Sequence, residues 1–178
     1  MKKLKEFDIP FVGLKQGKHQ FNYHIDNKFF EDYEYHDFNG ADIKIMLALD
    51  KKSSFLELFF QVEGMVNIPC DLTSEPYDQE ISATLELVVK FGEEYNDEME
   101  DLLIIPHGEF QINIAQYIYE MSILAVPAKR IHPGIEDGTL NSEILQKLEE
   151  LTPKEEKKNE NETDPRWDSL KKLLTDKK

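Results

Sequence analysis

Cysteine is almost absent from this 178-residue chain. The single Cys70 has no partner for an internal disulfide, and a body of about 150 residues can bury roughly 68–70% of its unfolded surface without one. No apolar run approaches the roughly 20 residues that a membrane helix needs. The first residues, Met1 to Asp8, lack the apolar core of a signal peptide. We therefore expect a soluble, cytoplasmic protein.

Short catalytic and metal-binding motifs are also missing. The chain has no phosphate-cradling glycine loop, no nucleophile elbow, no paired-cysteine zinc knuckle and no His-Glu-x-x-His helix. Its five histidines include no pair at i, i+4 spacing. The acidic residues between 93 and 101 lack the residue order of a calcium loop, so we expect an exposed loop there. We predict no cofactor, no bound metal and no enzymatic activity.

Cys70 is the remaining candidate for a nucleophile. A reactive cysteine needs partial exposure and a neighbouring base. Cys70 instead lies at the same alternate positions of the strand pattern as Val66 and Ile68, which favours a buried, apolar thiol.

Negative charge is in excess and unevenly spread. Residues 20–153 hold eight basic and 27 acidic side chains, a formal charge of −19, within a chain of net charge −15. Residues 1–19 carry five lysines against two acidic residues, and residues 154–178 carry eight basic against seven acidic groups. Because phosphate binding depends on Lys and Arg displacing counterions, the body should bind neither DNA nor RNA. The charge either attracts basic proteins or serves solubility alone.

Most of the body alternates with the period of a β-strand. The pattern is weak over 17–25 and clean over 43–49, 56–62 and 81–91. We interpret Gly64 as a bend or bulge before a separate short strand through Val66 and Ile68. Residues 71–78 form a turn cluster, and 102–105 a further apolar strand.

A helical period begins after residue 112. Asn113 and Gln116 have capping-box spacing ahead of a helix of about twelve residues that ends before Pro127. A second helical pattern runs over 140–151 and stops at Pro153. Strands followed by helices predict one α+β domain over 1–152, a mainly antiparallel sheet covered by a few C-terminal helices. Its aromatic residues either pack in the core, which is the default, or form a partner-facing patch; they include Phe29, Phe30, Tyr33, Tyr35, Phe38, Tyr117 and Tyr119.

The last 26 residues follow a different pattern. Residues 153–163 contain no apolar side chain other than Pro153, which predicts a flexible linker. Asp164 and Pro165 then suit the cap and first position of a short amphipathic helix over 164–178. Its apolar side would carry Trp167, Leu170 and Leu174, flanked by the basic Arg166 and Lys171. We expect this helix to dock either on the body or on a partner.

Three stretches together resemble one known family. They are Gly64 followed after five residues by Cys70-Asp71, the segment 112–127 with His132-Pro133, and Asp164-Pro165-Arg166-Trp167 with Leu170. This order is similar to that of the YceD family, the large ribosomal RNA subunit accumulation proteins. One departure is that Leu72 and Thr73 stand where many members have Arg and a second Cys. Any activity of paired cysteines is therefore not expected here.

The resemblance implies support of 23S ribosomal RNA accumulation or processing, and hence assembly of the large ribosomal subunit. It implies no enzymatic activity. Our leading hypothesis is a factor that contacts a basic ribosomal protein or a large-subunit precursor. The alternatives are direct ribosomal RNA binding by the basic N-terminus and tail, and a metal-dependent hydrolase that uses the carboxylates at 93–101.

Overall fold

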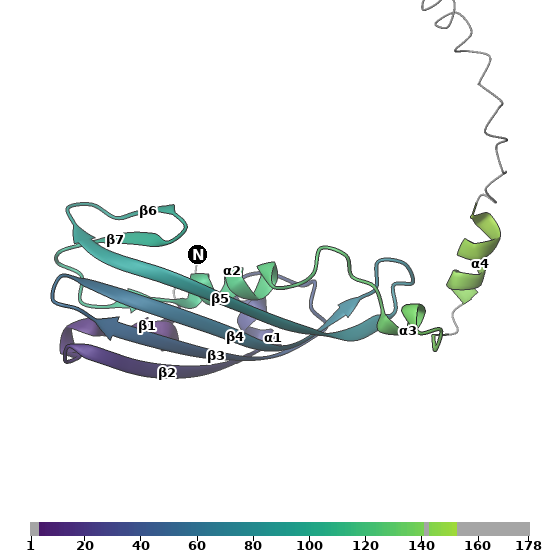
Figure 1. The fold of residues 1–178 in the computed structure, drawn as a ribbon, viewed down its shortest axis with the longest axis horizontal. Helices are drawn as coiled ribbons and strands as arrows, with labels where there is room; N and C mark the ends of the chain where they lie inside the picture. The colour runs from purple at the N-terminus through teal and green to yellow at the C-terminus, as the bar shows by residue number, and fades with distance from the viewer. Residues whose placement is uncertain (1–3, 141–142, 153–178) are drawn as a thin grey trace, which may run out of the picture. The chain divides into compact units, whose positions relative to one another are not determined.

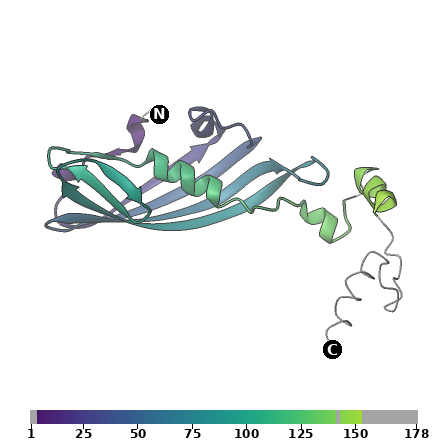
Figure 2. The same cartoon turned by 90° about the horizontal axis from the view of Figure 1, so that it is seen from above.

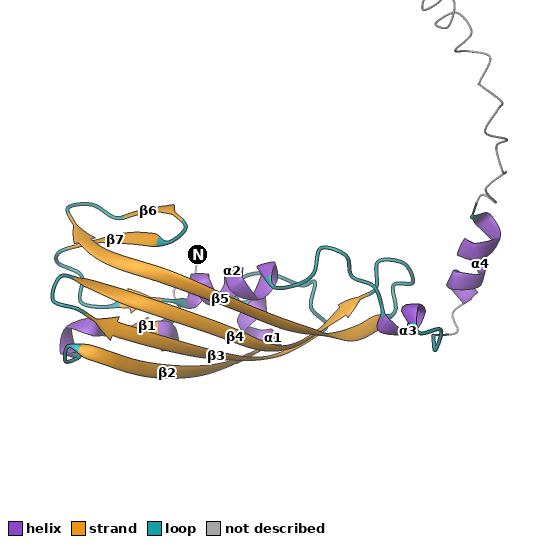
Figure 3. Cartoon of the chain, viewed as in Figure 1, coloured by secondary structure: helices purple, strands orange, loops and turns teal. Residues whose placement is uncertain are grey.

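The alternating segments form one six-stranded sheet within residues 4–140, in the order β2-β3-β4-β5-β7-β6 (Figures 1 and 3). The structure is a computed structural model that describes residues 4–140 and 143–152. The strands of this sheet are β2 (Gly17–Asp26), β3 (Gly40–Lys51), β4 (Phe55–Pro69), β5 (Pro76–Gly92), β6 (Asn96–Met99) and β7 (Leu102–Pro106).

The sheet is mixed rather than purely antiparallel. Neighbours from β2 to β5 pair antiparallel, as do β6 and β7, but β5 and β7 run parallel from Val88 opposite Leu102 to Gly92 opposite Pro106. The parallel pair arises because the chain leaves β5, forms the edge strand β6 and turns back before pairing. The α+β class with a dominant sheet is confirmed, and the parallel pair refines the predicted topology.

A small second sheet joins the N-terminal segment to the segment that follows β7. Strand β1 (Asp8–Ile9) pairs antiparallel with β8 (Ile112–Asn113). Two 3-10 helices, Lys5–Phe7 and Phe11–Gly13, flank β1. The Lys51 ammonium donates hydrogen bonds of 2.8 Å to the carbonyl oxygens of Phe11 and Leu14. This contact holds the N-terminal segment against the end of β3.

One face of the sheet carries the core. The side chains that point to it alternate along β3, β4 and β5, as the period-two pattern predicts. Helix α2 (Ala115–Leu124) packs on β4 and β5 over this face. Nearly inaccessible core residues are Ile43, Ile45, Leu47, Leu49, Leu56, Leu58, Phe60, Val62, Leu87 and Val89.

Helix α1 (Asn27–Glu31) lies on the same side of the sheet as α2 (Figure 2). The Asp26 carboxylate caps it by accepting a 3.0 Å hydrogen bond from the Lys28 amide. The Phe30 ring connects the two helices, with its centroid 6.4 Å from that of Tyr119. Because α1 lies between β2 and β3 in the chain, the helical layer does not consist of C-terminal helices alone.

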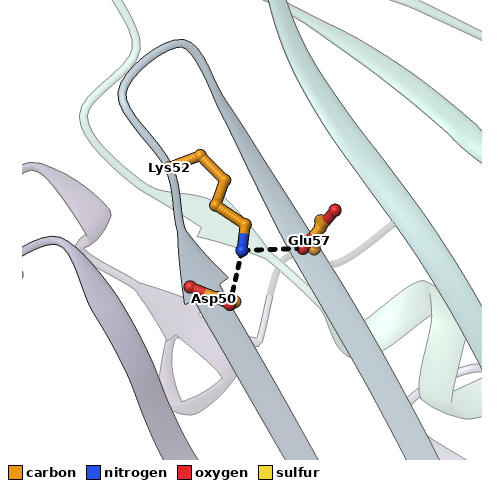
Figure 4. A network of polar contacts seen from close by, with 3 residues as sticks. All are labelled: Asp50, Lys52 and Glu57. Carbon is orange, nitrogen blue, oxygen red and sulfur yellow. Dashed lines mark hydrogen bonds and ion pairs between the residues drawn. The ribbon is translucent and has the colours of Figure 1, made fainter.

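The opposite face of the sheet is more exposed and mostly polar, although Phe59 and Met65 also lie on it. At its β3–β4 turn, the Lys52 ammonium lies 2.7 Å from Asp50 and 3.2 Å from Glu57 (Figure 4). Hydrogen bonds to these two carboxylates raise the pKa of Lys52. The pairs join both strands beside the turn and support the register of the hairpin.

Within the described residues, two further helices follow α2. Helix α3 (Pro133–Glu136) begins after His132, whose Nδ1 accepts a 2.9 Å hydrogen bond from the Gly134 amide. Helix α4 (Glu143–Leu151) lies in a second unit, Ser142–Lys178, and is considered by itself. It begins three residues later than the pattern over 140–151 predicted, and its proposed cover of the sheet stays a prediction. None of the described helices has the length and apolar character needed to cross a membrane.

Candidate functional site

Gly64 lies in the middle of β4, which continues without a register shift from Phe55 to Pro69. The predicted bend or bulge at this position is therefore wrong. A Cβ atom on Gly64 would lie 2.3 Å from the Asp42 carbonyl oxygen and 2.7 Å from the Ile43 Cα. The backbone of β3 occupies the space of a side chain, so the glycine is needed for close approach between strands.

Cys70 follows β4 at the turn into β5 and is 2% exposed, which confirms the predicted burial. Its Sγ accepts a 3.3 Å hydrogen bond from the His132 amide. Burial raises the pKa of the Cys70 thiol, but donors from His132, Leu72 and Thr73 outweigh it, and the pKa lies below its usual value. The sulfur is thus an acceptor inside a turn, shielded from solvent and engaged by the backbone.

Thr73 stands where many relatives were expected to carry the second cysteine. Its side chain is 3% exposed. The Thr73 hydroxyl accepts a 3.3 Å hydrogen bond from the Glu75 amide, and Thr73 helps to lower the pKa of the Cys70 thiol. Ser74 completes the turn with a left-handed φ of 60°, and its amide donates to the Cys70 carbonyl oxygen. In this chain the residue beside Cys70 in the turn thus carries a hydroxyl rather than a thiol.

Asp71 binds the chain segment that follows α2. Its carboxylate accepts a 2.9 Å hydrogen bond from the Arg130 amide, and its own amide donates to the Arg130 carbonyl oxygen at 2.8 Å. Together with the bond from His132 to Cys70, these contacts join segments 59 and 62 residues apart. We call this arrangement the Cys70 clip, made of Cys70, Asp71, Arg130 and His132.

The aromatic ring of Tyr77 closes the Cys70 clip. Its centroid lies 5.5 Å from that of His132. Burial raises the pKa of Tyr77, and the neighbouring Cys70 and Asp71 raise it further. The clip therefore fixes the exit of α2 and the start of α3 against the β4–β5 turn. The clip gives Cys70 and Asp71 a structural role, as the close approach to β3 does for Gly64.

Sequence reasoning did not find the clip partners Arg130 and His132 in this role. Each donates through its backbone amide, so the identity of its side chain gives no signal. Only the position of His132-Pro133 in the family pattern marked the segment.

The acidic segment between 93 and 101 is not a loop throughout. Residues Asn96–Met99 form β6 at the sheet edge, paired with β7. An edge strand exposes its side chains, so like charges are tolerated there and period-two alternation is not required. Among the residues that the structure describes, no group of three or more His, Cys, Asp or Glu side chains is placed to hold a metal ion.

The aromatic residues divide between core and surface. Phe29, Phe30 and Phe38 are buried, as the default predicted. The tyrosines of the same set are half-buried, and the rings of Tyr33 and Tyr119 stack 4.3 Å apart at 12°. The tail residues named above (Asp164, Pro165, Arg166, Trp167, Leu170, Lys171 and Leu174) and the linker 153–163 lie outside the described residues.

Removal of the Cys70 sulfur tests the clip. In Cys70→Ala the partly buried His132 amide loses its acceptor, and we expect the free energy of unfolding to fall by about 1–3 kcal/mol. Cys70→Ser keeps an acceptor and should lose less. Urea unfolding of the full chain measures both. Equal stability of Cys70→Ala and the parent protein would contradict a stabilising role for the clip.

Comparison with known proteins yields one family. A family model described as Large ribosomal RNA subunit accumulation protein YceD matches residues 58–174, more than half of the chain. The match includes the Cys70 clip and the whole of β5, β7 and α2. No curated protein and no solved structure matches.

Proposed function

The chain belongs to the YceD family, and from this membership we propose that it supports accumulation of the large-subunit ribosomal RNA. The finer proposal is a noncatalytic factor that acts in processing of 23S ribosomal RNA and assembly of the large subunit by contacting a basic ribosomal protein. The observation that carries it is the formal charge of −19 over residues 20–153. Cations on a client protein are the natural complement of such a surface.

The described geometry supports the noncatalytic reading. Cys70 is the single thiol of the chain, and its sulfur is buried and accepts backbone hydrogen bonds. A nucleophilic cysteine needs an accessible thiolate beside a base. The Asp71 carboxylate is likewise engaged with the backbone of Arg130. Cys70 and Asp71 thus stabilise the turn, and we assign partner binding to exposed residues elsewhere on the protein.

The acidic edge of the sheet is the surface that we assign to the client. Asp97, Glu98, Glu100 and Asp101 are exposed on or beside β6. An edge strand that presents carboxylates discourages pairing with another copy and attracts cations. The tail provides a second contact through Trp167 and its neighbours. Two weak contacts joined by a linker raise the overall affinity without one large interface.

Binding to a purified basic ribosomal protein of the large subunit tests this proposal. We expect the dissociation constant of the full chain to rise roughly tenfold between about 50 and about 300 mM salt, because screening weakens charge attraction. Trp167→Ala should weaken binding at both salt concentrations. No binding, or binding that is indifferent to salt, would contradict an electrostatic contact.

Direct ribosomal RNA binding through the basic ends is the second candidate. The observation that favours it is that Lys5, Lys15 and Lys18 are all exposed near the N-terminus. Crosslinking in growing cells separates the two. RNA adducts at these lysines, Arg166 or Lys171 would support direct binding, whereas adducts confined to ribosomal proteins would support the protein client.

A further inference from the structure

A cavity of about 270 Å³ opens beside the start of α2. Tyrosines from three separate segments line it: Tyr33 follows α1, Tyr95 precedes β6, and Tyr117 lies in the first turn of α2. We call it the tyrosine pocket. It is walled by aromatic rings, and its volume suits one long side chain rather than a large cofactor.

The inner wall of the tyrosine pocket is aliphatic. Leu103 and Ile105 come from β7, and Ile112 comes from β8. All three belong to the core or pack against it, with exposed fractions of 2%, 4% and 4%. Such a wall accommodates the methylene stem of a long side chain without leaving polar groups unpaired.

Among the described residues that line the tyrosine pocket, the charged one is acidic, and it stands beside the neutral amide side chains of Gln111, Asn113 and Gln116. Glu109 lines it. At one side the Asp97 carboxylate accepts a 3.0 Å hydrogen bond from the Tyr95 hydroxyl, and at another Glu120 accepts a 2.8 Å hydrogen bond from the Gln116 amide group. Among the described residues that line the cavity, none is basic.

The tyrosines respond to this negative field. Burial raises the pKa of Tyr117, and the charges of Tyr95, Asp97 and Glu120 raise it further. Burial raises the pKa of Tyr95, followed by its hydrogen bond to Asp97. Burial disfavours a charge of either sign, whereas the carboxylates of Asp97 and Glu120 disfavour an anion and favour a cation at the same place.

We propose that the tyrosine pocket binds an arginine side chain of a basic partner protein. The stem lies along the aliphatic wall, and the planar guanidinium stacks on the tyrosine rings near Glu109. Arginine fits better than lysine because its guanidinium stacks on aromatic faces and is more weakly hydrated. The identity of the partner as a basic protein rests on the proposed function, whereas recognition of the side chain rests on the cavity alone.

A small probe tests the pocket directly. N-acetyl-argininamide is titrated into the ¹⁵N-labelled full chain, with the uncharged N-acetyl-citrullinamide as its near-isosteric control. We expect amide shifts at Tyr95, Gln111 and Tyr117 with the arginine probe and none with the citrulline probe. Equal shifts with both probes, or shifts spread over the acidic surface without a maximum at these residues, would overturn the proposal.

Matched variants separate the pocket from general charge. Glu109→Gln with Glu120→Gln should weaken the arginine probe roughly fivefold. Glu80→Gln with Glu86→Gln removes the same charge from exposed positions of β5 and should leave the affinity within the error. An equal loss of affinity for the arginine probe in both double variants would show that the probe binds by nonspecific charge attraction.

The same variants distinguish this inference from the proposed function. If a ribosomal protein bound in a salt-sensitive way and both double variants weakened that binding equally, the proposal of an arginine pocket would fail. The proposal of a basic protein partner would stand. If the arginine probe bound at the pocket but no ribosomal protein bound the chain, the pocket would stand and the proposed function would fail.

Discussion

Gly64→Ala should lower the free energy of unfolding by about 3 kcal/mol, at the upper end of the usual cost of overpacking. The reason is that its new methyl group would meet the Asp42 carbonyl oxygen at 2.3 Å and the Ile43 Cα at 2.7 Å. Both atoms belong to the backbone of β3, so no side chain can rotate away. Relief requires β3 and β4 to separate, which weakens their hydrogen bonds near the centre of the sheet. Urea unfolding measures the loss.

Gly108→Ala is the matched control for this substitution. Nothing lies within 4 Å of a Cβ atom built on Gly108, and its φ is not in the left-handed region. We expect a change within about 0.5 kcal/mol. If Gly64→Ala unfolded at the same urea concentration as Gly108→Ala, the close approach of the strands would not explain the glycine of the family signature.

Phe30→Ala should cost about 3–5 kcal/mol, the range for deleting a buried phenylalanine ring. Phe30 is 1% exposed. Its ring lies 4.9 Å from that of Phe38 and 6.4 Å from that of Tyr119, so it links α1 and its following loop to α2. The cavity would also loosen Tyr33, which lines the tyrosine pocket. Hydrogen exchange should accelerate at the amides of α1.

Phe110→Ala serves as the control because the Phe110 side chain is 59% exposed. Its substitution should change stability by less than about 0.5 kcal/mol. A similar loss in both variants would show that the aromatic cluster does not fasten the helices to the sheet.

The long strands were predictable because the alternation of apolar and polar residues along each strand reflects which side chains are buried. Ile43 to Leu49, Leu56 to Val62 and Ile81 to Phe91 alternate with period two, and one face of the sheet is buried while the other is wet. The helix α2 was predictable from its period and from Asn113, whose side chain accepts a 3.2 Å hydrogen bond from the Ala115 amide. The predicted capping box is wrong, because the N-cap residue is Ile114, which makes no side-chain cap, and Gln116 bonds Glu120 instead.

The errors arose where a local signal had two meanings. Glycine in a strand indicates either a bulge or a close approach, and at Gly64 only the neighbouring β3 decides between them. Like charges over 93–101 indicate a loop or an exposed edge strand, and the pairing of β6 with β7 decides that case. Helix α1 was missed because its five residues are too few for a helical period to emerge.

The sequence by itself determined the strand-rich body, the burial of Cys70, the excess of negative charge and the resemblance to a family. These depend on composition and on periods that a short window contains. Tertiary structure alone decided the parallel partner of β5, the backbone contact at Gly64, the clip from Cys70 and Asp71 to residues about 60 positions away, and the gathering of three tyrosines around one cavity. Those features depend on long-range contacts, and several are made by backbone atoms, which every residue carries alike.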